Sequence, residues 1–250
     1  MSDDSAQFSG TMEVRERLKF DVASLEAYLK QNVDGFKGPL EVAQFKGGQS
    51  NPSYMLTTPN RKYVLRRKPP GKLLPSAHAV DREYRVMTAL ANTEVPVPKT
   101  FCLCEDEDVI GTMFYVMEFL DGDIEWDPSL PNSSKANRVA VFDSMNAAMA
   151  SLHMVDYKAV GLESFGKPTE YLARQISRWT KQYKASETET IEAMDNLMAW
   201  LPDNIPPGDE TAIVHGDYRL DNTVLNKNTH RVMGILDWEL ATLGHPLADF

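Results

Sequence analysis

Residues 213–222, IVHGDYRLDN, place a histidine, a glycine and an aspartate directly after two β-branched residues. An asparagine follows five residues beyond the aspartate, and a second aspartate, Asp237, follows in GILDWE. A hydroxyl group is a poor nucleophile until another group accepts its proton, and the carboxylate of Asp217 is suited to that task. The amide oxygen of Asn222 and the carboxylate of Asp237 are hard oxygen ligands. Such a pair commonly holds Mg²⁺ beside phosphate groups.

The order of these residues carries more weight than any one of them, because a single Asp or Asn in a loop usually serves turn geometry. The interval of five from Asp217 to Asn222 matches the catalytic loop of protein kinases. Asp237, expected at the end of a strand, takes the place of the kinase metal-binding aspartate. The set therefore predicts a phosphoryl-transfer site.

A nucleotide clamp is expected in the N-terminal half, in KGGQSNPSY between two predicted strands. Gly47 and Gly48 let the backbone approach a phosphate, and Ser50 and Asn51 offer hydrogen-bond donors. A Gly-Gly pair between strands is also a common hairpin turn, so this stretch alone leaves both interpretations open.

Two charged residues fit the same interpretation. Arg66 lies in YVLRR on the same strand face as Val64, where kinases place the lysine that contacts phosphate, and Glu83 lies on the next predicted helix, where kinases keep its partner. The alternative is a pair of solvated surface charges. The backbone of Glu118, Phe119 and Leu120, at the junction of the two halves, is expected to face the adenine.

The periodicity predicts an α+β, bilobal, protein-kinase-like fold with a β-rich N-lobe and a helical C-lobe. Residues 1–20 are polar and aperiodic and are expected to form a mobile tail. The N-lobe is assigned to residues 21–120 and the C-lobe to 121–250. Helices are expected within 20–33, 76–92, 134–155, 168–185 and 188–204, and strands within 40–58, 62–70, 97–106, 112–122, 212–217, 222–226 and 231–239.

The chain has 250 residues and a formal net charge of −10. Residues 1–120 have a net charge of −1 and residues 121–250 of −9, which disfavours binding to nucleic acid or to an anionic membrane. The N-terminus has no basic or apolar targeting segment, and no apolar run approaches the ~20 residues that span a bilayer. A cytoplasmic location is expected. The oligomeric state is not readable from the sequence.

The chain resembles the aminoglycoside phosphotransferase-like small-molecule kinases, relatives of choline and homoserine kinases, over roughly residues 22–250. The resemblance rests on VHGDYRLDN, on GILDWELATLGHPLADF and on GGQSNPSYML…YVLRRKPPGKLLPSAHAVDREYRVMTAL. These stretches are most similar to the branch whose kinase domains are fused to, or encoded beside, acyl-CoA dehydrogenases. The resemblance implies MgATP as cofactor, Asp217 as catalytic base, Asn222 and Asp237 as Mg²⁺ ligands, and a shaping role for His215. The acceptor would be a small molecule with a hydroxyl group, with a hydroxyacyl-CoA as one candidate.

Two departures from the family pattern stand out. Arg66 takes the place of a lysine, and an arginine holds phosphate with a fork of donors. The sequence ends at Phe250, thirteen residues after Asp237, whereas the family continues through further helices that help to build the acceptor pocket. The C-lobe is therefore expected to be incomplete on the acceptor side.

The sequence leaves alternatives to this function. An aminoglycoside or other amino-alcohol kinase would suit the acidic C-terminal half, and a non-catalytic nucleotide-binding module would explain Arg66. A metal-dependent hydrolase would have to use His215, His230 and His245 with the two aspartates, but the spacing disfavours it. A protein kinase is disfavoured because LDWE stands where D-F-G is expected and no A-P-E follows.

Overall fold

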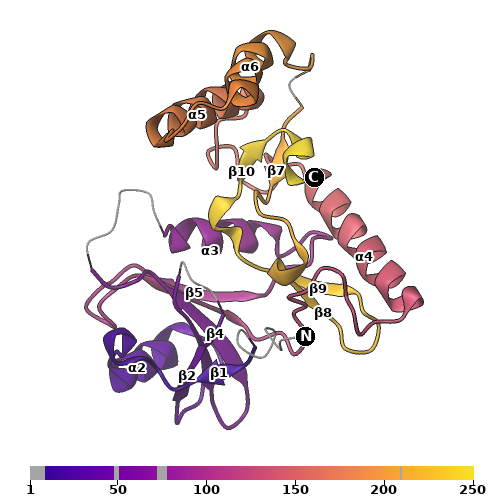
Figure 1. Ribbon diagram of the computed structural model, residues 1–250. Helices are drawn as coiled ribbons and strands as arrows, with labels where there is room; N and C mark the ends of the chain where they lie inside the picture. Colours follow the sequence, from indigo (N-terminus) through magenta and orange to yellow (C-terminus); the bar gives the residue numbers. More distant parts are fainter. Residues whose placement is uncertain (1–8, 48–50, 72–77, 209) are drawn as a thin grey trace.

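The N-terminal half is built on one six-stranded antiparallel sheet, in the order β1-β2-β3-β4-β6-β5 (Figure 1). The structure is a computed structural model that describes residues 9–47, 51–71, 78–208 and 210–250. The strands of the sheet are β1 (Thr11–Met12), β2 (Glu41–Phe45), β3 (Ser53–Thr57), β4 (Lys62–Arg67), β5 (Thr100–Cys104) and β6 (Phe114–Glu118).

Strand β4 divides its side chains between the two faces of the sheet, because successive residues of a strand point to opposite sides. Tyr63 and Leu65 pack into one hydrophobic core with helix α2 (Val22–Asn32). Val64 packs into a second core with helix α3 (Val80–Leu90). Arg66 lies on the Val64 face, so the alternation directs its guanidinium toward α3 and the C-lobe.

Local sequence explains where the N-lobe helices begin. The side chain of Asp21 accepts hydrogen bonds from the backbone N–H groups of Ala23 (2.9 Å) and Ser24 (3.2 Å) and so caps α2. Helix α3 follows the β4 strand and carries its apolar stripe, including Val80 and Leu90, against the core that it shares with the C-lobe.

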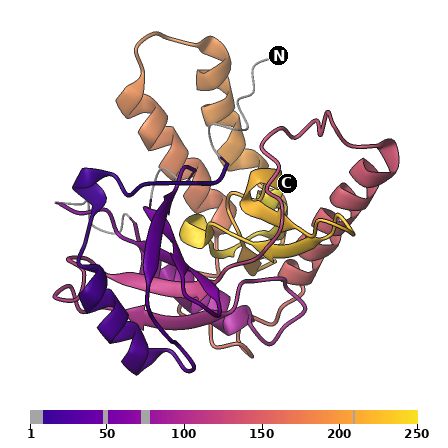
Figure 2. The same cartoon turned by 90° about the horizontal axis from the view of Figure 1, so that it is seen from below.

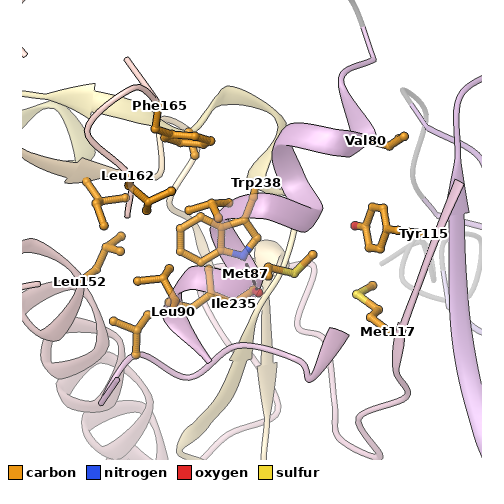
Figure 3. Packing of buried hydrophobic residues seen from close by; sticks show 14 of the residues in the cluster. Val80, Met87, Leu90, Tyr115, Met117, Leu152, Leu162, Phe165, Ile235 and Trp238 are labelled. Carbon is orange, nitrogen blue, oxygen red and sulfur yellow. Dashed lines mark hydrogen bonds between the residues drawn. The ribbon is translucent and has the colours of Figure 1, made fainter. Parts of the chain in front are cut away.

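The C-lobe is built around helix α4 (Lys135–His153) and two small antiparallel sheets. Trp238 is fully buried at the junction of the lobes, between α3 and residues of the C-lobe, and its indole N–H donates to the carbonyl of Ile235 (2.9 Å; Figure 3). One core therefore continues from the N-lobe into the C-lobe. The sheets pair β7 (Ala212–Val214) with β10 (Thr242–Gly244), and β8 (Thr223–Leu225) with β9 (Val232–Ile235).

Helices α5 (Tyr171–Ser186) and α6 (Glu192–Trp200) stand apart from the rest of the molecule (Figures 1 and 2). Both helices are described throughout, and neither contains a buried residue. Short 3₁₀ helices complete the chain: η1 (Glu16–Leu18), η2 (Leu201–Asn204), η3 (Leu220–Asn222), η4 (Trp238–Leu240) and η5 (Pro246–Asp249).

The predicted α+β, bilobal fold class is confirmed, and every predicted stretch contains a helix or strand, with α5 ending one residue beyond its expected range at Ser186. The tail expected over residues 1–20 is wrong for part of its length: Thr11 and Met12 pair with β2, and Leu18 is buried. A strand of two residues is too short to show a periodic pattern, and Thr11 and Met12 form one only because they pair with β2. Strand β10 was not predicted either, because its three residues are also too few to show a pattern. Within the described residues, no helix combines the length and apolar character needed to cross a bilayer.

Candidate active site

The loop that carries Asp217 leaves β7 through a sharp turn at Gly216. Gly216 has φ +82°, and a Cβ built there would lie 2.8 Å from the carbonyl oxygen of Leu240. Both the backbone conformation and the space therefore require glycine. The turn brings Asp217 out of the buried β7 strand, and its side chain is 40% exposed.

His215 is buried beneath this loop and uses both ring nitrogens inside the protein. Its Nε2 lies 2.9 Å from the carbonyl oxygen of Leu236, and its Nδ1 accepts a bond from the backbone N–H of Asp217 (3.3 Å). Burial lowers the pKa of His215, so the neutral imidazole is favoured. The ring also packs against Trp238, with centroids 4.7 Å apart. His215 has no nitrogen left for a metal ion or for proton transfer.

Asp217 and Asn222 contact each other directly. The Nδ2 of Asn222 donates to the carbonyl oxygen of Asp217 and to its Oδ2, both at 2.9 Å. This pairing fixes the amide orientation and leaves Oδ1 of Asn222 to face a cation. Arg219 Nε lies 3.7 Å from Asp217 Oδ2 on the exposed side.

The β8–β9 pair brings Asp237 to the same place. The backbone N–H of Leu236 donates to the carbonyl of Asn222 (2.8 Å), which joins the two segments just before Asp237. Asp237 itself has φ +64°, a conformation that is uncommon for a residue with a side chain. The strands therefore bring Asn222 and Asp237 together, although 15 positions separate them in the sequence.

Arg66 joins the two lobes through carboxylates. Its Nε lies 3.0 Å from Glu83 Oε2 on α3, and its Nη2 donates to Asp237 Oδ1. Glu83 is fully buried and also accepts a bond from the Tyr115 hydroxyl (3.1 Å). Burial raises the pKa of Glu83 to about 7, against the opposing effect of Arg66. Arg66 and Glu83 are thus a buried pair and not two solvated charges.

Asn51 has a different environment from the one expected. It is fully buried, and its Nδ2 donates to Glu83 Oε1 (2.9 Å) and to Glu239 Oε2 (3.3 Å). Its Oδ1 lies 3.0 Å from His78 Nδ1. The expected phosphate donor therefore has its amide committed to two carboxylates, one in each lobe. Gly47 precedes this residue on the loop after β2, while Gly48 and Ser50 lie outside the described residues.

The linker between the lobes follows β6. The backbone N–H of Glu118 donates to the carbonyl of Lys99 (2.8 Å), and the carbonyl of Leu120 accepts from Gly122 (3.0 Å). These two backbone groups therefore have partners within the protein. A Cβ on Gly234 would overlap the side chain of Leu120, so a glycine in β9 lets the linker pass closely.

Sequence reasoning missed two acids. Glu239 lies two residues after Asp237, and carboxylate oxygens of Glu83, Asp237 and Glu239 come within 4.8 Å of one another. Asp249 accepts hydrogen bonds from the backbone N–H groups of His215 (2.9 Å) and Gly216 (2.7 Å). Both acids lie in the stretch GILDWELATLGHPLADF, which carries part of the family resemblance. Their spacing alone does not distinguish them from acids on the surface.

The histidines of the rival hydrolase site do not gather. His230 lies in the turn between β8 and β9, where its backbone N–H donates to Asn226, and His245 Nε2 lies 3.5 Å from Glu210. In the part of the chain that the structure describes, the cluster with metal-ligand spacing consists of carboxylates. Oxygen ligands suit Mg²⁺ and not a zinc site built on imidazoles.

Comparison with known proteins agrees with this geometry. Residues 41–250 match the model of the phosphotransferase enzyme family. The chain is 48% identical to acyl-CoA dehydrogenase family member 10 of Mus musculus over 240 residues, covering 96% of this chain and 22% of that protein. It is also 48% identical to member 11 of Rattus norvegicus over 244 residues, covering 96% and 31%. The chain thus spans less than a third of either of these two curated relatives.

Solved structures give the same answer. A Ralstonia eutropha protein classed with the aminoglycoside phosphotransferases is 57% identical, with a TM-score of 0.85, covering 93% of this chain and 68% of that one. The aminoglycoside phosphotransferase APH(4)-Ia, solved as a ternary complex with ADP and hygromycin B, shares the fold at 17% identity and a TM-score of 0.62, covering 90% and 74%. The bilobal fold and the matched residues define the family of the chain. The chain belongs to the phosphotransferase enzyme family.

Proposed function

We propose that this protein transfers the γ-phosphate of ATP to a hydroxyl group of a small molecule. The observation that carries the proposal is the convergence of Asp217, Asn222 and Asp237 of the C-lobe with the Arg66–Glu83 pair of the N-lobe. Phosphoryl transfer needs positioning and charge stabilisation more than covalent chemistry, and this set supplies both. ADP and an ATP analogue are bound in solved structures that share the fold.

Asp217 is the proposed general base. Its side chain is partly exposed, and the Asn222 amide holds one of its carboxylate oxygens at 2.9 Å. Oδ1 is then free to accept the proton of an acceptor hydroxyl as the oxygen attacks the γ-phosphorus. The bond from that phosphorus to the bridging oxygen of ADP breaks in the same transfer. His215 holds the backbone of the base and takes no part in the proton transfer.

The residues present fit a magnesium ion. Asn222 offers Oδ1, and Asp237 offers a carboxylate that is now paired with Arg66. These two residues would hold Mg²⁺, which when bound offsets the charge of the ATP phosphates. Glu239 is close enough to add a carboxylate oxygen to the same set. Arg66, with its fork of donors, is proposed to contact phosphate oxygens.

The nucleotide clamp completes the proposal. Gly47, Gly48 and Ser50 are assigned to phosphate binding, and the backbone of residues 118–120, chiefly Phe119, to the adenine. Asn51 is assigned to link the two lobes, because its amide bonds to Glu83 and Glu239.

The acceptor is proposed by class. A hydroxyacyl-CoA is favoured because the curated relatives carry the name acyl-CoA dehydrogenase and this chain matches about a fifth to a third of their length. An aminoglycoside or amino alcohol is the second candidate, supported by the class of the Ralstonia eutropha relative. The net charge of the C-terminal half does not decide between them, since several of its acids belong to the site.

Acceptor-dependent release of ADP from MgATP tests the proposal, with hydroxyacyl-CoAs, aminoglycosides, choline and homoserine as acceptors. Turnover on one class that Asp217→Asn abolishes would establish both the chemistry and the acceptor class. Binding of MgATP without turnover on any acceptor would favour a non-catalytic nucleotide-binding module. The Arg219→Gln variant is the control, because it removes a charge from an exposed neighbour of Asp217 and leaves the carboxylate of Asp217 in place.

A further inference from the structure

Helix α3 brings Glu83 to the candidate active site, and the residue before it, Arg82, is bonded to the C-lobe. The Nη2 of Arg82 donates to the carbonyl of Phe165 (2.8 Å) and to the carbonyl of Ala241 (3.2 Å). Its guanidinium carbon also lies 4.2 Å from the centroid of the Phe165 ring. One side chain of an N-lobe helix therefore contacts two separate segments of the C-lobe.

Both of these C-lobe segments are fixed by their own packing. Ala241 is buried at the end of η4. Phe165 is buried in the core that joins α3 to the C-lobe (Figure 3). A Cβ on Gly166 would overlap Oγ1 of Thr242, so the segment that contains Phe165 runs directly against β10. The two carbonyls that accept from Arg82 therefore belong to well-packed backbone.

Arg82 lies between the two segments that supply acids to the site. On α3 it directly precedes Glu83, which is fully buried. In the C-lobe it reaches the end of η4, which contains Glu239 and begins directly after Asp237. The carboxylate oxygens of Glu83, Asp237 and Glu239 come within 4.8 Å of one another. The bond from Arg82 to Ala241 therefore connects the backbones that carry these acids.

We infer that Arg82 is a positioning residue: its bond to Ala241 sets the spacing between α3 and η4, and with it the spacing of the acids beside the proposed phosphate and Mg²⁺ positions. The inference rests on the proposed function, because it assigns a consequence for nucleotide binding to the placement of these acids. Replacing a residue that orients metal ligands from behind typically costs about 10- to 100-fold in metal affinity or activity. The competing explanation is that Arg82 only fastens the two lobes together. Its loss would then lower stability and leave the nucleotide affinity of the folded protein unchanged.

Arg85, one turn further along α3, provides a matched control. Its Nη2 donates to the carbonyl of Gly161 (3.1 Å) and lies 2.8 Å from the Oγ of Ser164. Both acceptors belong to the segment just before Phe165, whereas the second acceptor of Arg82 lies at the end of η4. Removing the Arg85 side chain therefore loosens α3 from that segment and leaves the bond to η4 in place.

The experiment compares wild type with Arg82→Lys, Arg82→Met and Arg85→Met at a temperature where circular dichroism shows all four folded. Isothermal titration gives the dissociation constant for MgADP, and hydrogen exchange gives the protection of the backbone over residues 238–243. We expect Arg82→Met to bind MgADP about 10- to 100-fold more weakly than wild type and to exchange faster over these residues. Arg82→Lys should fall between the two, because one ammonium group replaces the fork of donors. Arg85→Met should bind MgADP as wild type does.

Equal dissociation constants for Arg82→Met and Arg85→Met would overturn the inference. If Arg82→Met does not fold, the same comparison is made between Arg82→Lys and Arg85→Met. A wild type that does not bind MgADP would defeat the proposed function and the inference with it. A wild type that binds MgADP but phosphorylates no acceptor would defeat the proposed reaction, while the binding comparison still decides the role of Arg82.

Discussion

The two lobes differ in how fully the charged groups that they bring to the site are bonded. On the N-lobe side, Arg66 and Glu83 are buried and bonded to each other, Arg66 is also bonded to Asp237, and Asn51 extends the network to Glu239. On the C-lobe side, the side chain of Asp217 is 40% exposed. Its carboxylate accepts a hydrogen bond from Asn222 at 2.9 Å, whereas Arg219 lies at 3.7 Å. The proposed phosphate-binding groups are therefore already bonded to one another, whereas the carboxylate of the proposed base is left accessible.

A third region extends this contrast. Helices α5 and α6 contain exposed tryptophans, Trp179 (63%) and Trp200 (56%), and are joined to each other by the ion pair between Lys184 and Asp195. The number of contacts that hold the side chains therefore decreases from the Arg66–Glu83 network to Asp217, and then to helices α5 and α6. Each of the following substitutions tests one level of that order.

Arg66→Ala should have the largest effect on stability. It would leave Glu83 buried without its cation, beside Asp237 and Glu239, and breaking a buried ion pair typically costs about 3–5 kcal/mol. Urea denaturation measures the loss in unfolding free energy. Arg66→Lys should fall between wild type and Arg66→Ala, because one ammonium group cannot reproduce both the Nε and the Nη2 contacts. Equal stability of all three proteins would contradict the preorganised network.

Gly216→Ala should have the next largest effect. The residue has φ +82° and a Cβ would lie 2.8 Å from Leu240 O, so the loop must move or strain by about 1–3 kcal/mol. Turnover should fall with little change in MgATP affinity, as measured by isothermal titration. The comparison variant Gly35→Ala also has a positive φ (+75°) but nothing within 4 Å, and it should lose stability without losing turnover.

The acid limb of the stability curve gives a smaller effect with a definite sign. The pKa of Asp249 is lowered from its ordinary value of 3.8, so its carboxylate stabilises the fold at pH values above 3.8. That contribution is lost as the pH falls through the lower, folded-state pKa. The unfolding free energy of wild type should therefore decline more steeply below about pH 4 than that of Asp249→Asn, a difference measurable by chemical denaturation. Parallel declines would show that Asp249 is not held as an anion.

Trp179→Ser should have the smallest effect. The side chain is 63% exposed on α5, and surface substitutions usually change stability by less than about 0.5 kcal/mol. Trp238→Phe is the buried counterpart, since that side chain is fully inaccessible and its indole N–H is bonded to Ile235. A large loss in Trp179→Ser, seen by thermal melting, would place α5 among the elements that carry the fold.

The sequence predicted well what depends on local physics. The helix expected within residues 20–33 is found as α2, and the strand expected within 62–70 is found as β4, with Arg66 on the face of Val64 as predicted. Asp217, Asn222 and Asp237 were found because their spacing carries a chemical requirement. These residues lie together in the structure, while their roles stay predictions.

The remainder depends on which distant segments meet. The short pairing of Thr11 and Met12 with β2 has no periodic signal of its own. Asn51 bonds to two carboxylates because η4 of the C-lobe comes close to it, and Glu239 of η4 is 188 residues away in the sequence. Asp249 differs from a surface acid because its carboxylate accepts hydrogen bonds from the backbone N–H groups of His215 and Gly216, which follow β7. The sequence does not show that these segments meet.

The most direct test of the central claim compares wild type with Asp217→Asn in two measurements on the same preparations: turnover of MgATP with the best acceptor, and the dissociation constant for MgATP. The account predicts a loss of turnover of about 10²- to 10⁴-fold, as for removal of a general base, with MgATP affinity essentially unchanged. Unchanged turnover in Asp217→Asn would contradict it.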